Sequence, residues 1–367
     1  MNANNNLCTK KILWVLTISA RKNFGARVEM NKRLVTGIDI SPNSLKAVVL
    51  KPNGNSYALL GYKEIILKEA IVAENHTINH QEIVKTLKEM KKELPFRARK
   101  VAISVPDNAV MSKNLQIEQG IEESDKEFAV VQAFSCQSPF PVEELNLDFI
   151  QVDVDKRRQG SNSYQVFATR KDVVAPRVEA IKKSGLKPVL VDVHSQSLGR
   201  MWQWVAECFP QKNKYCLLDI GTLGSSFTMF SEQGELFYKE FSHAPSTLVS
   251  LFENDLDVDD TKTAIEQFNR QIVERVKRQR QLYTTMNGRQ NIEGIWLSGE
   301  GAAIPMLAEE LSSQLSLECE RLNPLSLFEI KVSECKSCVP NWPHFTAAAG
   351  LALRGIEWLG SEHALST

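Results

Sequence analysis

Two segments of the chain end an apolar run in an aspartate and then continue into a turn of small, polar residues. Backbone amides and hydroxyls in such a turn can donate hydrogen bonds to phosphate oxygens, and the carboxylate can hold Mg²⁺ directly or through water. The candidate phosphate-binding residues of the two segments are Asp39, Ser41, Asn43, Ser44, Lys46, Asp219, Gly221, Thr222 and Ser225. Within this set, Asp39 and Asp219 are the candidate Mg²⁺ ligands.

A third segment, residues 295–307, carries a glycine-rich turn between an apolar run and the start of a helix. Glycine lets the backbone approach a ligand closely, and a helix N-terminus adds favourable amide groups. We therefore expect Gly299, Glu300 and Gly301 to face the adenosine and α-phosphate part of ATP.

The elements that must position these residues alternate between short β-rich runs and amphipathic helices, as in an α/β protein built around mixed sheets. Because residues 34–50 and 215–230 share one plan, we interpret them as two copies of one hairpin in two halves that face each other. The residues after Pro106 are interpreted as a polar stretch. We expect further strands at 57–68, 101–105, 145–154, 164–169 and 187–193, helices at 80–94, 124–136, 173–183, 195–208 and 260–286, and a strand, turn and helix over 292–315.

The expected domain organisation is two halves with an insertion. Residues 1–33 are interpreted as an N-terminal extension outside the fold, since Met30 offers a fresh start directly before the first strand. A signal peptide, suggested by Lys10 and Lys11 before an apolar run, is the alternative. The first half is expected to comprise 34–106 and 190–210, the inserted subdomain 107–189, and the second half 211–360 with a shortened small subdomain at about 242–290.

Composition narrows the class of protein. The 367 residues carry 44 Lys and Arg against 44 Asp and Glu, with a mean hydropathy of -0.23. This balance argues against nucleic acid or acidic lipid as a partner, and no apolar run reaches the length of a membrane span. Seven scattered cysteines, an odd number, favour reduced thiols in a cytoplasm over a disulfide framework.

The order of these motifs resembles that of actins, sugar kinases and heat-shock chaperone ATPases. Within that superfamily, residues 137–149 resemble the Pro-Phe-Pro signature of the PilM family of type IV pilus assembly proteins. Residues 168–174 and 184–193 also resemble that family, and the likeness extends over 34–353. It implies an actin-like (duplicated ribonuclease H-like) fold with an inserted subdomain.

The resemblance also implies a function. A PilM-like protein would be a cytoplasmic, ATP-binding scaffold that binds the N-terminal peptide of the membrane protein PilN. It would reach the inner-membrane face through this protein partner, would contact other platform and motor proteins of the pilus, and could associate with itself.

Several departures from the family pattern fall on the nucleotide site. Ser41 and Pro42 replace a glycine-containing turn, and Glu300 interrupts a triple glycine. His194 stands where related ATPases place the carboxylate that positions the attacking water. His194 and Asp39 are our candidate catalytic residues. A neutral imidazole lacks that negative charge, so we expect nucleotide binding with slow hydrolysis at most.

Two other functions share the fold. A sugar- or acetate-kinase-like phosphotransferase would need a second-substrate carboxylate in the cleft, and none stands out. An FtsA-like cell-division protein would end in an amphipathic membrane helix, for which residues 355–360 are too short. Cys335 and Cys338 have the spacing of a redox or zinc pair, but we interpret them as unpaired thiols because no second pair accompanies them.

Overall fold

The computed structural model describes residues 33–67, 70–73, 77–152, 161–221, 224–242, 258–287, 290–332 and 342–365. The segment 1–32, Thr222 and the pair Cys335 and Cys338 lie outside these residues. The described chain forms a six-stranded, a five-stranded and a three-stranded sheet.

The six-stranded sheet has the order β14-β3-β2-β1-β4-β8. Strands β1 to β3 pair antiparallel, whereas β1, β4 and β8 run parallel. Side chains alternate across it: Ile38 and Val49 pack with helices α1 and α3 on one face, while Val48 and Leu50 face α4 and α8 on the other. The bounds are β1 Val35–Ile40, β2 Ser44–Asn53, β3 Ser56–Ile66, β4 Lys100–Val105, β8 Lys187–Val193, β14 Glu329–Ile330, α1 His80–Glu93, α3 Lys171–Lys183, α4 His194–Cys208 and α8 Thr346–Leu365.

The five-stranded sheet repeats this plan with the order β11-β10-β9-β12-β13. Leu218 and Ile295 pack with helices α6 and α7, whereas Leu217 and Trp296 join the core that contains α4 and α8. The bounds are β9 Tyr215–Ile220, β10 Ser225–Phe230, β11 Leu236–Phe241, β12 Gly294–Ser298, β13 Glu318–Arg321, α6 Val258–Met286, the 3-10 turn η5 Glu300–Ala303 and α7 Leu307–Leu315. The two sheets and their helices therefore form the duplicated halves that the hairpin repeat predicts.

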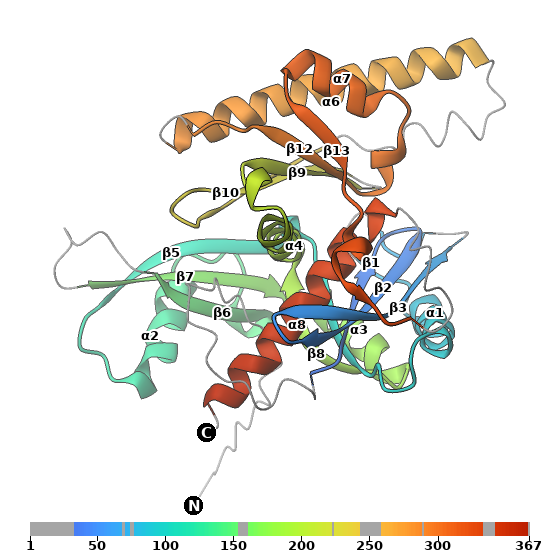
Figure 1. The fold of residues 1–367 in the computed structure, drawn as a ribbon. Coiled ribbons are helices and arrows are strands. Elements are labelled where there is room, and N and C mark those ends of the chain that lie inside the picture. Colours follow the sequence, from blue (N-terminus) through green and yellow to red (C-terminus); the bar gives the residue numbers. More distant parts are fainter. Residues whose placement is uncertain are drawn as a thin grey trace, which may run out of the picture.

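Helices α4 and α8 lie between the two large sheets (Figure 1). They approach closely because α8 carries small residues where it crosses its neighbours. A Cβ on Gly350 would lie 1.9 Å from the carbonyl oxygen of Ser197 on α4, and a Cβ on Gly37 of β1 would lie 2.0 Å from that of Ala348. Glycine at both positions is therefore a packing requirement between the halves.

The three-stranded antiparallel sheet, β5-β7-β6, stands beside the six-stranded sheet and carries α2 on one face. Its strands are β5 Val110–Glu118, β6 Leu145–Val152 and β7 Ser161–Arg170, and α2 spans Glu123–Ser135. Strand β5 corrects our interpretation of a polar stretch after Pro106. Leu115 and Ile117 are buried while Asn114 and Gln116 between and beside them are exposed, so only one face of this edge strand is apolar.

Helix α3, which the sequence analysis placed in the inserted subdomain, packs elsewhere. Val174, Val178 and Ile181 of α3 are buried with α1 against the six-stranded sheet. The division into domains remains a prediction.

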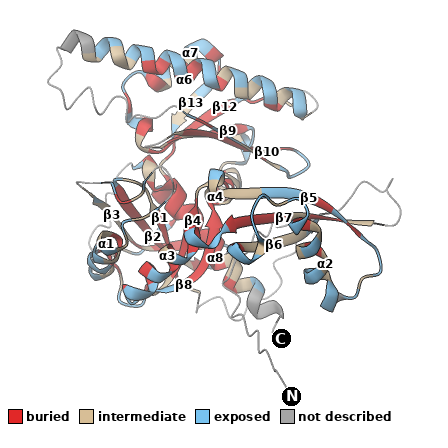
Figure 2. Ribbon diagram, turned by 180° about the vertical axis from the view of Figure 1, so that it is seen from behind, coloured by how far each residue is buried: buried red, intermediate tan, exposed pale blue. Residues whose placement is uncertain are grey.

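Figure 2 shows which parts of the fold are buried. The inner strands of the two large sheets are buried, whereas the outer sides of α2 and α6 are exposed.

Candidate functional site

The first hairpin brings Asp39 and Lys46 onto one face. These residues are direct partners in the β1–β2 register, so their side chains point to the same side of the sheet. The turn closes where the Ser41 amide donates to the Ser44 carbonyl at 3.0 Å, and the Ser41 hydroxyl donates to Oδ2 of Asp39 at 2.9 Å. Asn43 at the turn tip is exposed. The hairpin thus directs a carboxylate, two hydroxyls and one ammonium toward Glu300 of the second half. We call the region where the two hairpins and the glycine-rich turn meet the cleft.

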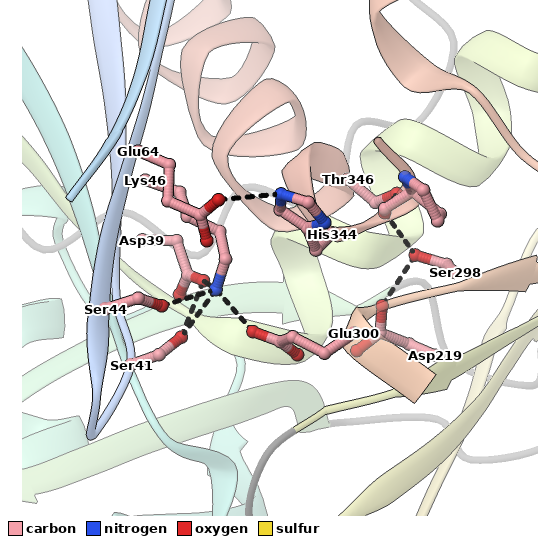
Figure 3. Close-up of polar contacts among 11 residues, drawn as sticks. Asp39, Ser41, Ser44, Lys46, Glu64, Asp219, Ser298, Glu300, His344 and Thr346 are labelled. Carbon is pink, nitrogen blue, oxygen red and sulfur yellow. Dashed lines mark hydrogen bonds and ion pairs between the residues drawn. The ribbon is translucent and has the colours of Figure 1, made fainter. Parts of the chain in front are cut away.

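Lys46 is the buried cation of this site, with a side chain only 1% exposed. Its Nζ donates to the Ser44 hydroxyl at 2.8 Å and forms an ion pair with Glu300 of the second half (Figure 3). Burial acts to lower the pKa of the Lys46 ammonium, but the Glu300 and Asp39 carboxylates outweigh it and raise this pKa. Lys46 therefore stays charged inside the cleft.

The second hairpin presents Asp219 at the end of β9. Asp219 and Ser298 are partners in the parallel β9–β12 register, and the Ser298 hydroxyl donates to Oδ1 of Asp219 at 2.6 Å. Burial raises the pKa of the Asp219 carboxyl. The amide of Gly221 donates to the Gly224 carbonyl at 2.9 Å, which closes the turn, and Ser225 is buried at the start of β10.

The glycine-rich turn after β12 depends on Gly299. Its φ is +81°, and a Cβ there would lie 2.4 Å from the carbonyl oxygen of Ile220. Any other residue would be strained at this position and would collide with β9. The turn continues into η5 with Gly301 buried, and it directs Glu300 between the hairpins: a Cβ on Gly221 would lie 4.0 Å from Oε2 of Glu300.

His194 begins α4 and lies near the half-buried carboxyls of Asp107 and Asp219. Oδ2 of Asp107, in the 3-10 turn η2 (Asp107–Ala109), accepts a hydrogen bond of 2.9 Å from the Ser195 amide and so caps α4. Burial raises the pKa of Asp107 above its ordinary value, while the charge of His194 acts to lower the pKa of both Asp107 and Asp219. Sequence reasoning found His194 but missed Asp107, whose one signal is its position directly after β4.

A second contact that sequence reasoning missed joins β3 to the chain before α8. Nε2 of His344, in the 3-10 turn η7 (Pro343–Phe345), lies 3.1 Å from Oε2 of Glu64 (Figure 3). Burial acts to raise the pKa of Glu64, but His344 and the more distant charge of Lys46 lower it below the ordinary value. No local pattern links these residues, which lie almost 300 positions apart in the sequence.

The residues for Mg²⁺ do not form a site by themselves. Across the described ranges, no group of three or more Asp, Glu, His or Cys side chains is arranged to hold a metal ion. Asp39 and Asp219 reach the cleft from opposite hairpins, and Thr222 lies outside the described residues. Mg²⁺ in proteins is often held by one or two carboxylates together with the phosphates of a substrate, and these two aspartates fit only that arrangement.

A cavity of about 1030 Å³ opens between α6 and the start of α7, and its wall includes Pro305 and Met306 just beyond η5. Asn269 of α6 donates through Nδ2 to the Pro305 carbonyl at 3.0 Å. Its buried Oδ1 has no hydrogen-bond partner among the residues that the structure describes. Lys262, Glu266 and Arg270 line the same cavity. Nothing in the sequence alone distinguished this cavity from a solvated helix surface.

Two sheets of one plan with two inner helices, and a cleft where two hairpins and a glycine turn meet, define an actin-like α/β fold. The chain belongs to the PilM family, because the family model for "Type IV pilus assembly protein PilM" matches residues 37–356. The fold and the family predicted from the sequence are thus both confirmed. In the described residues, no helix combines the length and apolarity of a membrane span.

Solved structures support the same fold. The chain is similar to a protein of a "PilM-PilN type IV pilus biogenesis complex", with 22% identity and a TM-score of 0.68 over 88% of this chain and 98% of that one. It is also similar to a glycerol dehydratase reactivase, with 8% identity and a TM-score of 0.53 over 88% of this chain and 99% of that one. It is similar as well to a diol dehydratase-reactivating factor in nucleotide-free form, with 8% identity and a TM-score of 0.52 over 89% of this chain and 100% of that one.

Proposed function

We propose that this chain is an ATP-binding scaffold of the type IV pilus inner-membrane complex and that it binds the cytoplasmic N-terminal segment of PilN. The observation that carries this proposal is membership of the PilM family over residues 37–356. The similarity to a protein solved in a PilM-PilN complex supports the choice of partner. In this proposal the protein acts in the cytoplasm and reaches the membrane through PilN and not through an anchor of its own.

The cleft supports ATP as the ligand. Asp39, Asp219 and the Gly299 turn converge from three segments, and Lys46 supplies a buried positive charge for phosphate. The cavity beside η5 offers Lys262 and Glu266 to a ribose, and the buried Oδ1 of Asn269 could accept from a donor such as an adenine amino group. Mg²⁺ would enter with the phosphates.

Hydrolysis in this proposal is slow. The cleft has His194, not a carboxylate, at the start of α4, and Asp107 is engaged in capping that helix. Steady-state phosphate release should therefore fall well below the range of about 1–10³ s⁻¹ typical of enzymes. Fast turnover that disappears in Asp39→Ala would contradict a scaffold role.

The partner can be tested with purified protein and a PilN N-terminal peptide. Phe140 of the Pro-Phe-Pro segment is 37% exposed, and the Arg170 guanidinium lies 5.6 Å from its ring centroid. Phe140 therefore offers an apolar surface at the edge of the three-stranded sheet. We expect retention of the peptide over a scrambled control, and weaker retention by Phe140→Ala. Phe96→Ala is the matched control because Phe96 is 83% exposed on the loop after α1. Equal retention of both peptides, with and without ATP, would reject PilN as the partner.

A further inference from the structure

The hydrogen-bonding capacity of Lys46 is used up within the chain. An ammonium group has three donors and no acceptor. Its Nζ contacts the Ser44 hydroxyl at 2.8 Å, the Ser41 hydroxyl at 3.4 Å, and Oε1 of Glu300. Because the Lys46 side chain is 1% exposed, solvent does not compete for these donors. While Glu300 is in place, Lys46 has no donor left for a phosphate oxygen.

The Glu300 carboxylate lies where the two hairpins and the glycine turn would direct a phosphate. Oε1 is on Lys46 of the first hairpin, and Oε2 faces the Gly221 turn of the second. Its charge adds to the effect of burial in raising the pKa of Asp219, so it is felt across the cleft. Glu300 is therefore an anion held in a cleft with two other carboxylates by one buried ammonium.

We propose that Glu300 acts as an internal substitute for phosphate: it joins the two halves through Lys46 in the absence of ligand, and the phosphate chain of a nucleoside triphosphate must displace it. This inference rests on the proposed nucleotide binding and adds its regulation. A phosphate and Glu300 cannot share Lys46, because two anions near one ammonium repel each other in a poorly solvated cleft.

The displacement has a route and a consequence. The Glu300 side chain is 34% exposed, so its carboxylate can turn from the cleft into solvent. Lys46 belongs to the first half and Glu300 to the second, so ligand binding removes a contact between the halves. ATP binding is thereby linked to how freely the two halves move relative to each other. The affinity for ATP is also lower than it would be if Lys46 were not paired with Glu300.

The test compares Mg-ATP affinity by calorimetry in the full chain and in Glu300→Gln, which keeps the side-chain shape but removes the charge. We expect Glu300→Gln to bind about tenfold or more tightly, the effect of freeing one charged hydrogen-bond donor. Glu309→Gln, an exposed residue on α7 with the same charge change, should leave affinity unchanged. The double variant Lys46→Met with Glu300→Gln should lose the gain, because the gain depends on Lys46.

Each outcome separates this inference from the nucleotide proposal. Binding by Glu300→Gln with none by the wild type supports the inference and rejects ATP binding by the natural protein. Equal affinity in the two proteins overturns the inference and leaves ATP binding in place, and binding by neither overturns both. Circular dichroism of each variant checks folding, and if Glu300→Gln does not fold, Glu300→Asp shortens the side chain with its charge kept and should also bind ATP more tightly than the wild type.

Discussion

The charged residues of the cleft are ordered by contacts between distant segments. Asp219 accepts a hydrogen bond from the Ser298 hydroxyl, whose oxygen lies 3.3 Å from the Pro343 carbonyl oxygen. Thr346 at the start of α8 donates to that same carbonyl at 2.7 Å. The Asp219 carboxylate is therefore connected through Ser298 to the chain at the start of the inner helix α8. Such a residue holds its geometry before any ligand arrives, which lowers the cost of binding.

Asp219→Ala should weaken Mg-ATP binding. Loss of one charged contact in a buried site is expected to cost about 1–3 kcal/mol of binding free energy. Calorimetry on the wild type and the variant measures the difference, with Asp125→Ala on the exposed side of α2 as the control. Unchanged affinity in a folded Asp219→Ala protein would remove Asp219 from the nucleotide site.

The lowered pKa of Glu64 predicts that the stability of the protein depends on pH. His344 and Lys46 lower its pKa in the folded protein against the opposing effect of burial. Its stabilising contribution is therefore present above the unfolded pKa of about 4.3 and is lost as the pH falls through the lower, folded value. Wild type and Glu64→Gln should differ most in urea unfolding near pH 7 and converge at acid pH; a gap that widens in acid would show that the pKa of Glu64 is not lowered.

Sequence reasoning located residues that share a hairpin and missed those that meet across the fold. Asp39, Ser41 and Lys46 are within eight positions of one another, so the turn that joins them is visible locally. Asp107 and Glu64 owe their environment to α4 and η7, which fold against them from far along the chain. The sequence also predicted the turn that contains Glu300. It did not predict the contact of Glu300 with Lys46, because that contact depends on how the two halves pack against each other.

At the scale of elements, periodicity predicted the buried parts best. The strands of both hairpins and the long helices carry apolar residues at regular spacing, and all of them are present. The sequence analysis did not predict strands β11, β13 and β14, since they are short and partly exposed. In β13, for example, both end residues are exposed and the two inner ones are half-buried. Helix α8 packs closely along its run of small residues, because a Cβ on Gly350 would lie 1.9 Å from the Ser197 carbonyl oxygen.

Gly350→Ala should destabilise the protein. Alanine favours a helix by about 1 kcal/mol over glycine, so propensity alone predicts a gain. The new methyl group would lie 1.9 Å from the Ser197 carbonyl, and overpacking of this kind costs about 1–3 kcal/mol or more. We expect a net loss in the urea unfolding free energy, whereas Ser361→Ala at the exposed end of α8 should change little. A stabilised Gly350→Ala would mean that α4 and α8 separate readily.

At the scale of the whole molecule, ion pairs hold helix α8 to strand β8 and to helix α4. The Arg354 guanidinium on α8 donates to Oδ2 of Asp192 on β8 at 2.7 Å, and Arg200 on α4 pairs with Glu357 on α8. Asp192 is fully buried, and its Oδ1 accepts from the Val193 amide at 2.9 Å. These pairs fix the position of α8, which contacts both halves, and thus the geometry of the cleft between them.

Arg354→Met should therefore be strongly destabilising. It leaves the Asp192 carboxylate inside the protein without its cation, and breaking a buried pair in this way costs about 3–5 kcal/mol. Removing both charges, as Asp192→Asn with Arg354→Met, should restore much of that loss because no uncompensated charge remains. Lys214→Met, which breaks an exposed pair with Glu293, is the control and should leave the unfolding free energy nearly unchanged. Urea unfolding followed by tryptophan fluorescence measures the unfolding free energy of the wild type and of the three variants. If the double variant were as unstable as Arg354→Met, the loss would come from the packing of α8 and not from the buried charge.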